Sequence, residues 1–411
     1  MKRRLKALTI IFLFLVSLIP IKASADATPP SINAAGCALI DASTGQMLYG
    51  KNENTQYEPA STTKVMTALI VLEKCKLNDE VTIQQDVDRE DGTRIGLKKG
   101  DVLTVHELLL GLLLDSGNDA ADALAYHVSG SIDEFAKLMN AKAKELGATN
   151  TNFKNPSGLP DPQHLTTPHD LALFLREAVN NQDFIKISTT PSYTLAMRND
   201  PQRTINLYNK NYMINKGSKF YYPNALCGKN GYTITANQTY VASAKKDDHI
   251  LVASFLYAVD KNQNFEDMKT VFDYGFNNFS WVHIYSKNDK VSEYKINNTL
   301  TIPLLSTKDL DYVVPKGDET KESYDIKVED KDLSKQSFNE GDEILKGKVY
   351  VNDKELETVD LAAGASRNYT SLFDVSSLSK NSIIAIYGGC ALAALGAATG
   401  LGILIKQKFK K

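Results

Sequence analysis

The apolar pattern of the chain changes twice between residues 37 and 276, and this order constrains the fold. Alternating apolar residues predict strands near both ends of this stretch, at 37–41, 46–49, 239–244 and 250–257. Between them, apolar residues recur at helical spacing, at 61–77, 105–114, 118–127 and 132–146. We therefore expect one antiparallel sheet built from both ends of the stretch, with a helical subdomain inserted between its strands.

The first 25 residues resemble a secretion signal. A basic start at residues 2–6 precedes an apolar run at 8–19, and small residues follow at 23–25 in the pattern of a cleavage site. We expect residues 1–25 to be a signal peptide, with the mature chain beginning near Asp26. An uncleaved N-terminal anchor is the alternative, which the short apolar core disfavours.

The other end carries a longer apolar run, residues 383–405, without a charged side chain. A helix of this length, at about 1.5 Å per residue, suffices for a bilayer core of about 30 Å. The basic tail at 406–411 predicts a cytoplasmic C-terminus, so the preceding chain faces outward. An amphipathic interfacial helix is the alternative, but the run has no polar face. A G-x-x-x-G pattern at 396–400 is weak support for dimerisation.

The outward part is long enough for two domains. A first domain at 26–281 ends with a predicted amphipathic helix around 265–276. A small all-β domain follows at 282–363, with strands predicted at 299–304, 324–328 and 345–361, the last containing a hairpin turn at 352–353. A Ser-rich segment at 364–382 suits a linker to the membrane.

Charge excludes a class of partners. The chain has 47 Lys and Arg and 49 Asp and Glu, and nine of the basic residues lie before Asp26 or after Ile405. The part between carries 38 basic and 49 acidic residues, a net charge of about −11. A nucleic-acid or anionic-lipid binder would show a basic patch, so we expect neither.

Nothing in the sequence predicts a metal or another cofactor. The cysteines are too scattered for a disulfide framework, although one bridge with a free thiol and three free thiols both stay open for the outward part; they are Cys37, Cys75, Cys227 and Cys390. The histidines form no H-E-x-x-H or H-x-H zinc motif; they are His106, His127, His164, His169, His249 and His283. We expect His164 and His169 to be structural or solvent-facing.

The first candidate for chemistry is the pair Ser61 and Lys64 in Ser-Thr-Thr-Lys. A serine hydroxyl needs a partner to take its proton, and residues three apart at a helix start project from one face. Burial and nearby positive charge lower a lysine pKa, which would make Lys64 a base. Alone, the same residues read as a helix N-cap and a solvated lysine.

Two further short motifs follow in order. Ser116-Gly117-Asn118 lies at a tight corner between two helices, where Ser116 would relay a proton and Asn118 would bind a substrate amide. Lys229-Asn230-Gly231-Tyr232-Thr233 leads into a strand, where a lysine charge and backbone N–H groups would meet a peptide carboxylate and an oxyanion. Each motif alone could be an ordinary helix cap or basic turn.

Together these residues resemble the serine-type D-alanyl-D-alanine carboxypeptidases, the low-molecular-weight penicillin-binding proteins. The resemblance extends from about residue 35 to residue 276 and includes the runs at 58–64, 95–100, 112–121 and 155–160. It implies an α/β (α+β) fold of the serine β-lactamase and penicillin-binding-protein type, with an antiparallel sheet and a helical subdomain. The C-terminal β domain and anchor also match the layout of this family.

The resemblance also implies roles. Ser61 would attack the penultimate D-Ala carbonyl of a peptidoglycan stem peptide with Lys64 as base, and Ser116 would assist proton transfer. Asn118 would help to place the substrate and Lys229 would face the terminal carboxylate. Backbone N–H groups of Ser61 and Tyr232 would form the oxyanion hole, and β-lactams would trap Ser61.

One residue departs from the family pattern, since Asn230 stands where the family has Thr or Ser. An Asn amide also donates a hydrogen bond, but it reaches further than a hydroxyl. Losing a charge-assisted hydrogen bond costs about 1.5 to 3 kcal/mol, or roughly ten- to more than a hundredfold in rate. We expect activity that is retained but slower.

Two other functions fit part of the pattern. A class A β-lactamase needs an added glutamate for deacylation, and no E-x-x-L-N stretch lies between Asn118 and Lys229. A catalytically idle peptidoglycan-binding or β-lactam-sensing protein of the same fold is the second alternative. The intact Ser61 and Lys64 disfavour it, whereas Asn230 favours it weakly.

Overall fold

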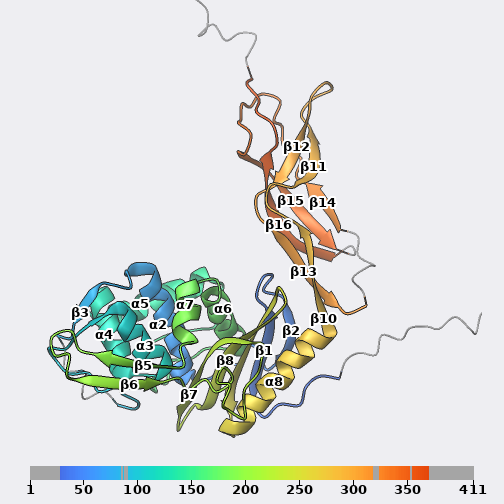
Figure 1. Ribbon diagram of the computed structural model, residues 1–411. Coiled ribbons are helices and arrows are strands. Elements are labelled where there is room, and N and C mark those ends of the chain that lie inside the picture. The colour runs from blue at the N-terminus through green and yellow to red at the C-terminus, as the bar shows by residue number, and fades with distance from the viewer. Residues whose placement is uncertain (1–27, 85–86, 88–90, 318–323, 352–353, 370–411) are drawn as a thin grey trace, which may run out of the picture. The chain divides into compact units, whose positions relative to one another are not determined.

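The structure, a computed structural model, describes residues 28–84, 87, 91–317, 324–351 and 354–369 (Figure 1). Within these, the chain forms two compact units. The first comprises the chain up to Val282 and the segment that begins at Asp311; the second comprises His283–Leu310 and residues after 320.

The first unit is built on a five-stranded antiparallel sheet of order β2-β1-β9-β8-β7. Its strands are β1 (Gly36–Asp41), β2 (Met47–Lys51), β7 (Ala225–Thr233), β8 (Asn237–Lys246) and β9 (His249–Ala258). The two predicted hairpins therefore join one sheet, as expected, because β1 pairs with β9, for example Leu39 opposite Ala253. Strand β7 is an edge of the sheet, and residues 60–63, at the start of the helical subdomain, contact it.

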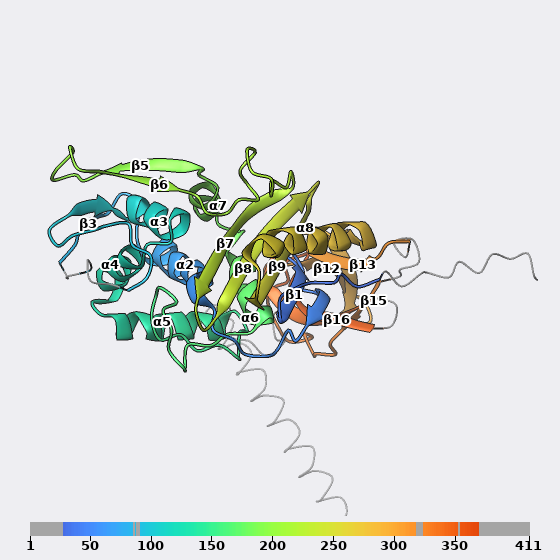
Figure 2. The same cartoon turned by 90° about the horizontal axis from the view of Figure 1, so that it is seen from below.

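Alternate residues of the strands pack on opposite faces. Leu39 and Phe255 join the apolar cluster under α8 (Lys261–Asn278), which lies alongside β1, β8 and β9 in Figure 2. Ile40 and Val252 join the larger cluster on the other face, beneath the helical subdomain. This alternation follows from the two-residue period of a strand, and it gives the sheet a core on both sides.

The helices of the helical subdomain follow the predicted order. The structure has a short 3-10 turn, η1 (Ala60–Thr63), that leads into α2 (Lys64–Lys74), followed by α3 (Val105–Leu114), α4 (Asn118–Ser129) and α5 (Ile132–Glu145). Helix α3 is buried, as its nearly continuous apolar sequence predicts, and Thr104 and Glu107 close its start with a capping box.

Several elements of the first domain were not predicted. They are α6 (Pro168–Ala178), α7 (Gln182–Ser188), and the hairpins β3 (Glu80–Thr82) with β4 (Val102–Thr104) and β5 (Ser192–Ala196) with β6 (Thr204–Tyr208). Three strands near or in the C-terminal unit, at 279–285, 290–295 and 310–315, were not predicted either. Both helices begin at an N-cap residue that the sequence shows, because the side chains of Thr167 and Asn181 accept hydrogen bonds from N–H groups of the first turn.

The C-terminal unit confirms the predicted all-β domain. Its sheet has the order β11-β12-β16-β15-β14, with strands β11 (Lys290–Lys295), β12 (Thr301–Ser306), β14 (Tyr324–Val328), β15 (Glu343–Val351) and β16 (Lys354–Ala363). A separate two-stranded sheet pairs β10 (Phe279–Tyr285) with β13 (Leu310–Pro315), and the boundaries of the two units, after 282 and after 310, fall within these strands. The predicted turn at 352–353 lies outside the described residues.

The predicted signal peptide, most of the linker, the apolar run at 383–405 and the basic tail also lie outside the described residues. Among the helices that the structure describes, none has the length and apolar character needed to cross a membrane.

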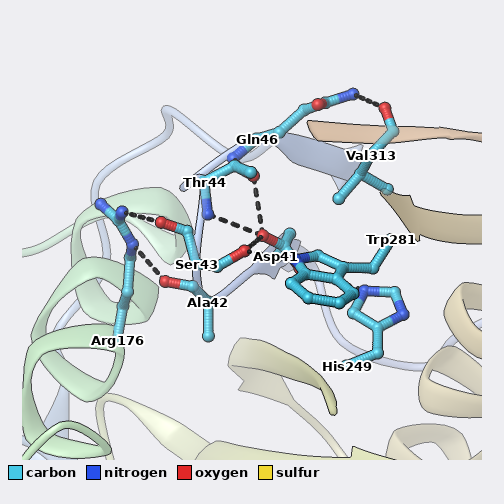
Figure 3. Close-up of polar contacts among 9 residues, drawn as sticks. All are labelled: Asp41, Ala42, Ser43, Thr44, Gln46, Arg176, His249, Trp281 and Val313. Carbon is cyan, nitrogen blue, oxygen red and sulfur yellow. Dashed lines mark hydrogen bonds and ion pairs between the residues drawn. The ribbon is translucent and has the colours of Figure 1, made fainter. Parts of the chain in front are cut away.

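The turn between β1 and β2 is fixed by a buried carboxylate, shown in Figure 3. Asp41 Oδ1 accepts hydrogen bonds from Ser43 Oγ at 2.7 Å and from Thr44 N at 2.7 Å, and Oδ2 lies 3.1 Å from His249 Nε2. Burial opposes the charge, but these neighbours lower the pKa of Asp41. Arg176 of α6 donates to the carbonyl of Ala42 at 2.7 Å, which ties the turn to the helical layer.

Candidate active site

Ser61 and Lys64 meet at the start of the first long helix. Ser61 lies in the 3-10 turn η1, Lys64 begins α2, and Lys64 Nζ is 3.1 Å from Ser61 Oγ. The residue before the serine, Ala60, has a φ of +48°, which is unusual for a residue with a side chain. The spacing of three residues therefore produces the contact that the sequence predicted.

Lys64 is fully buried and has two further partners from distant parts of the chain. Its Nζ lies 2.7 Å from Asn118 Oδ1 and 2.6 Å from the carbonyl oxygen of Ser157. Burial and the positive charge of Lys229 hold the pKa of Lys64 well below its usual range. A lysine whose pKa is lowered can lose its charge more easily and then accept a proton from a neighbouring hydroxyl.

The second motif closes the site from the corner between α3 and α4. Ser116 has a φ of +66°, and its buried Oγ has no hydrogen-bond partner among the described residues. Asn118 begins α4, and its Nδ2 donates to the carbonyl of Asp91 at 2.6 Å. The amide of Asn118 is thereby oriented with its oxygen toward Lys64, while the Ser116 hydroxyl stays available for a ligand.

The third motif lies on the edge strand β7. Lys229 is buried, and its Nζ donates to the carbonyl of Asn230 at 2.9 Å. Burial lowers the pKa of Lys229 to about 7. The negative charge of Asp115 opposes this shift, and the positive charge of Lys210 adds to it. A carboxylate that bound beside Lys229 would favour its charged form.

Gly231 lets β7 approach the serine closely. A Cβ atom at this position would lie 2.6 Å from the backbone N of Ser61, closer than real Cβ contacts. Only glycine therefore fits here, and the N–H of Ser61 faces the strand that carries Tyr232.

These residues line one pocket of about 290 Å³, made of Ser61, Thr93, Asp115, Ser116, Lys210, Lys229, Asn230, Gly231, Tyr232, Gln238 and Lys261. Lys64 and Asn118 lie behind Ser61 as its hydrogen-bond partners. Thr233 does not line the pocket, because it lies at the end of β7, where its Oγ1 accepts from Ala236 N at 2.9 Å. The site can thus present a serine, a base and several cations to an anionic peptide.

Sequence reasoning gave no role to several of these residues. Lys210 pairs with Asp115 at 2.9 Å, and Lys261 begins α8; both add positive charge to the pocket. Asp119 accepts hydrogen bonds from the backbone N of Gly96 at 2.8 Å and of Leu97 at 2.9 Å, as well as from Ile95. The runs at 95–100 and 112–121, noted only as similar to a family, are therefore joined by this carboxylate.

The run at 155–160 supports the nucleophile from the other side. Asn155 Oδ1 accepts from the backbone N of Gly158 at 2.7 Å and of Leu159 at 3.1 Å, which folds the loop tightly. Gly158 has a φ of +84° and lies against the carbonyl oxygen of Ala60. Its place in the loop presents the carbonyl of Ser157 to Lys64.

His164 is structural, in agreement with the expectation. Its Nδ1 accepts from Lys154 N at 3.1 Å, so Nε2 carries the hydrogen and donates to Thr63 Oγ1 at 3.0 Å. Burial lowers the pKa of His164 to about 4, which keeps the ring neutral. His169 lies at the start of α6, 3.7 Å from the carboxylate of Asp170. Cys37, Cys75 and Cys227 are free thiols.

Two sequence profiles match the chain. The profile of the family described as D-alanyl-D-alanine carboxypeptidase matches residues 23–259. A profile described as penicillin-binding protein 5, C-terminal domain, matches residues 279–368.

Relatives and solved structures agree with the profiles. The chain is 33% identical over 305 residues to D-alanyl-D-alanine carboxypeptidase DacF of Bacillus subtilis, covering 72% of this chain and 77% of DacF. It is 37% identical over 243 residues to DacB2 of Mycobacterium tuberculosis, covering 58% and 80%. The crystal structure of penicillin binding protein 5 from Haemophilus influenzae matches with a TM-score of 0.70 and 26% identity, over 82% of this chain and 98% of that one.

The contact between Gly158 and Ala60 predicts a sharp effect of one added methyl group. We expect Gly158→Ala to displace Ala60 and Ser61, and so to slow acylation of Ser61 by a fluorescent penicillin at least tenfold while lowering the melting temperature. Gly130→Ala is the matched control, because Gly130 has a φ of +79° but nothing within 4 Å of an added Cβ. It should cost about 1 to 2 kcal/mol of stability and leave labelling unchanged. Equal labelling of both variants would contradict the prediction.

Proposed function

Because the chain belongs to the family of D-alanyl-D-alanine carboxypeptidases, we propose a division of roles among the residues around Ser61. The protein is a serine-type D-Ala-D-Ala carboxypeptidase, which confirms the resemblance drawn from its motifs. One observation carries the proposed roles: Lys64 Nζ, with its lowered pKa, lies 3.1 Å from Ser61 Oγ. We propose that the substrate is a peptidoglycan stem peptide that ends in D-Ala-D-Ala, from which the enzyme removes the terminal D-alanine.

In the acylation step, Lys64 takes the proton of Ser61 as Oγ attacks the penultimate D-Ala carbonyl carbon. The carbonyl oxygen becomes negative as the bond forms, and it is bound by the backbone N–H groups of Ser61 and Tyr232. The close approach of Gly231 to the N of Ser61 supports this placement, because it brings the strand that carries Tyr232 beside the serine.

The terminal D-Ala carries the carboxylate that orients the substrate. Lys229 binds it, helped by the side-chain amide of Asn230, and Lys210 and Lys261 add to the positive potential of the pocket. As the peptide bond breaks, the proton held by Lys64 passes through the Ser116 hydroxyl to the leaving amine. Asn118 holds Lys64 in place with its Oδ1 and helps to place the stem peptide.

Water then attacks the carbonyl carbon of the acyl-enzyme while Lys64 takes a proton from it, and Ser61 Oγ leaves and receives that proton from Lys64, which lies 3.1 Å away. A β-lactam presents a carboxylate and a reactive amide in similar positions, so it acylates the same serine. The proton-transfer groups around Ser61 are all side chains of this protein, and the proposed mechanism uses no cofactor.

We extend the proposal to the cellular location. The sequence supports a signal peptide at 1–25 and a single membrane-spanning helix at 383–405 with its basic tail inside. The catalytic domain at 26–281 and the β domain at 282–363 would then lie outside the membrane, followed by the linker at 364–382. Expression of a chain truncated after residue 380 tests this, because secretion of the truncated protein into the medium is expected and its retention in the membrane fraction would contradict the anchor.

Covalent labelling and product release test the proposed site. We expect penicillin to add its own mass to Ser61 in an intact-mass measurement followed by peptide mapping. D-alanine release from diacetyl-Lys-D-Ala-D-Ala should follow and should be blocked by the antibiotic. Ser61→Ala, the control, should lose both signals and stay folded. An adduct without D-alanine release would favour the sensing protein, and the absence of an adduct would remove Ser61 as nucleophile.

Asn230 provides a graded test. We expect Asn230→Thr to raise kcat/KM for D-alanine release about tenfold, because a shorter hydroxyl donor crowds the substrate carboxylate less than an amide. Asn230→Ala, which removes the donor, should lower kcat/KM below that of the unmodified protein. Steady-state kinetics on the same tripeptide measure both, and no gain with threonine would count against a slowed site.

A further inference from the structure

The residues just before Ser61 are hydrogen-bonded to the hairpin formed by β7 and β8. Thr239 is fully buried on β8, and its Oγ1 donates to the carbonyl of Pro59 at 2.8 Å. Thr235, in the turn between the strands, donates to Glu58 Oε2 at 2.5 Å. These two bonds join segments about 180 residues apart in the sequence, so they fix a tertiary contact rather than a local turn.

Thr239 lies at the point where β7 comes closest to the nucleophile. It is the register partner of Gly231, and paired residues of an antiparallel sheet place their side chains on the same face. A Cβ atom at Gly231 would lie 2.6 Å from Thr239 Oγ1 and also 2.6 Å from the N of Ser61. The threonine hydroxyl and the N–H of the serine therefore border the same small space.

The backbone between Pro59 and Ser61 needs such support. Ala60 has a φ of +48°, a conformation that costs a residue with a side chain about 1 to 2 kcal/mol and persists only when the surroundings enforce it. The carbonyl of Pro59 accepts two local bonds from Thr62, from its Oγ1 at 2.6 Å and its backbone N at 3.3 Å, in addition to the bond from Thr239. Of these three bonds, only the one from Thr239 connects the turn to the sheet.

We propose that Thr239 is a positioning residue for the oxyanion hole. By holding the carbonyl of Pro59, its hydroxyl keeps the strained turn in place and the N–H of Ser61 aimed past Gly231 into the same space as the N–H of Tyr232. This inference rests on the proposed function, because it assigns those two N–H groups to the developing oxyanion.

Loss of the Thr239 hydroxyl should lower the rate of the chemical step and leave the affinity for the substrate unchanged. The oxyanion forms as Ser61 attacks, so a misplaced N–H weakens an interaction made in the transition state and leaves substrate binding intact. The carboxylate site at Lys229 lies on the same strand and does not use the Pro59 carbonyl. A displacement near 1 Å at a reacting centre can lower the rate by about a hundredfold.

The test replaces the hydroxyl by a methyl group of similar size. In the full-length protein, Thr239→Val should lower kcat for D-alanine release about ten- to a hundredfold. It should slow acylation by penicillin in parallel and change KM by less than about twofold. Thr239→Ser keeps the donor and should restore most of the rate.

Ser254→Ala is the matched structural control. Ser254 is a fully buried hydroxyl on β9 that donates to the carbonyl of Pro168 at 2.5 Å, on a proline away from the site. We expect it to lower the melting temperature as much as Thr239→Val, while kcat stays within about twofold of the unmodified protein.

Three outcomes would overturn the inference: unchanged kcat in Thr239→Val, no recovery in Thr239→Ser, or an equal loss of kcat in Ser254→Ala. Failure of the proposed function is distinguishable, since the unmodified protein would then form no adduct on Ser61. An unmodified protein that is labelled, together with a Thr239→Val variant labelled at the same rate, rejects only the positioning role.

Discussion

The site depends on the burial of one amine, Lys64, in the core between the sheet and the helical subdomain. Water cannot solvate its charge there, so its pKa falls, and the carbonyl of Ser157 and the amide of Asn118 compensate for the lost water. These partners come from the loop at 155–160 and from the first residue of α4, which are far apart in the sequence. The loop at 155–160 and the corner before α4 are therefore both required to hold one side chain against Ser61.

The edge position of β7 would give a peptide access to the enclosed nucleophile. An edge strand has backbone groups that are not used within its sheet, and an extended peptide can pair with them. Lys229 is buried on this strand, and Gly231, which has no side chain, lets the strand lie close to the serine. In the proposed mechanism the same strand supplies charge for the substrate carboxylate and backbone groups for the peptide, and it also contacts the nucleophile closely.

The sequence was informative where geometry is local. Ser61 and Lys64 are three residues apart, and a helical turn alone brings them together; the apolar sequence of α3 likewise allows only a buried helix. Contacts such as Lys64 with Ser157, or Thr239 with Pro59, join residues separated by 93 and 180 positions. Their pairing depends on how the sheet and the helices pack, which residue spacing does not encode. Gly158 and Asp119 stood in runs that were recognised by resemblance, yet their contacts appear only in three dimensions.

The three partners of Lys64 also limit what a change in its charge can do. The oxygens of Asn118 and Ser157 are carbonyl acceptors, so each takes a hydrogen from the amine, at 2.7 and 2.6 Å, whether Lys64 is charged or neutral. The contact with Ser61 Oγ at 3.1 Å is different, because a charged Lys64 donates to the hydroxyl, whereas a neutral one has a lone pair left to accept from it. Loss of one proton from Lys64 would therefore reverse this contact alone, and the serine hydrogen would then point toward the amine.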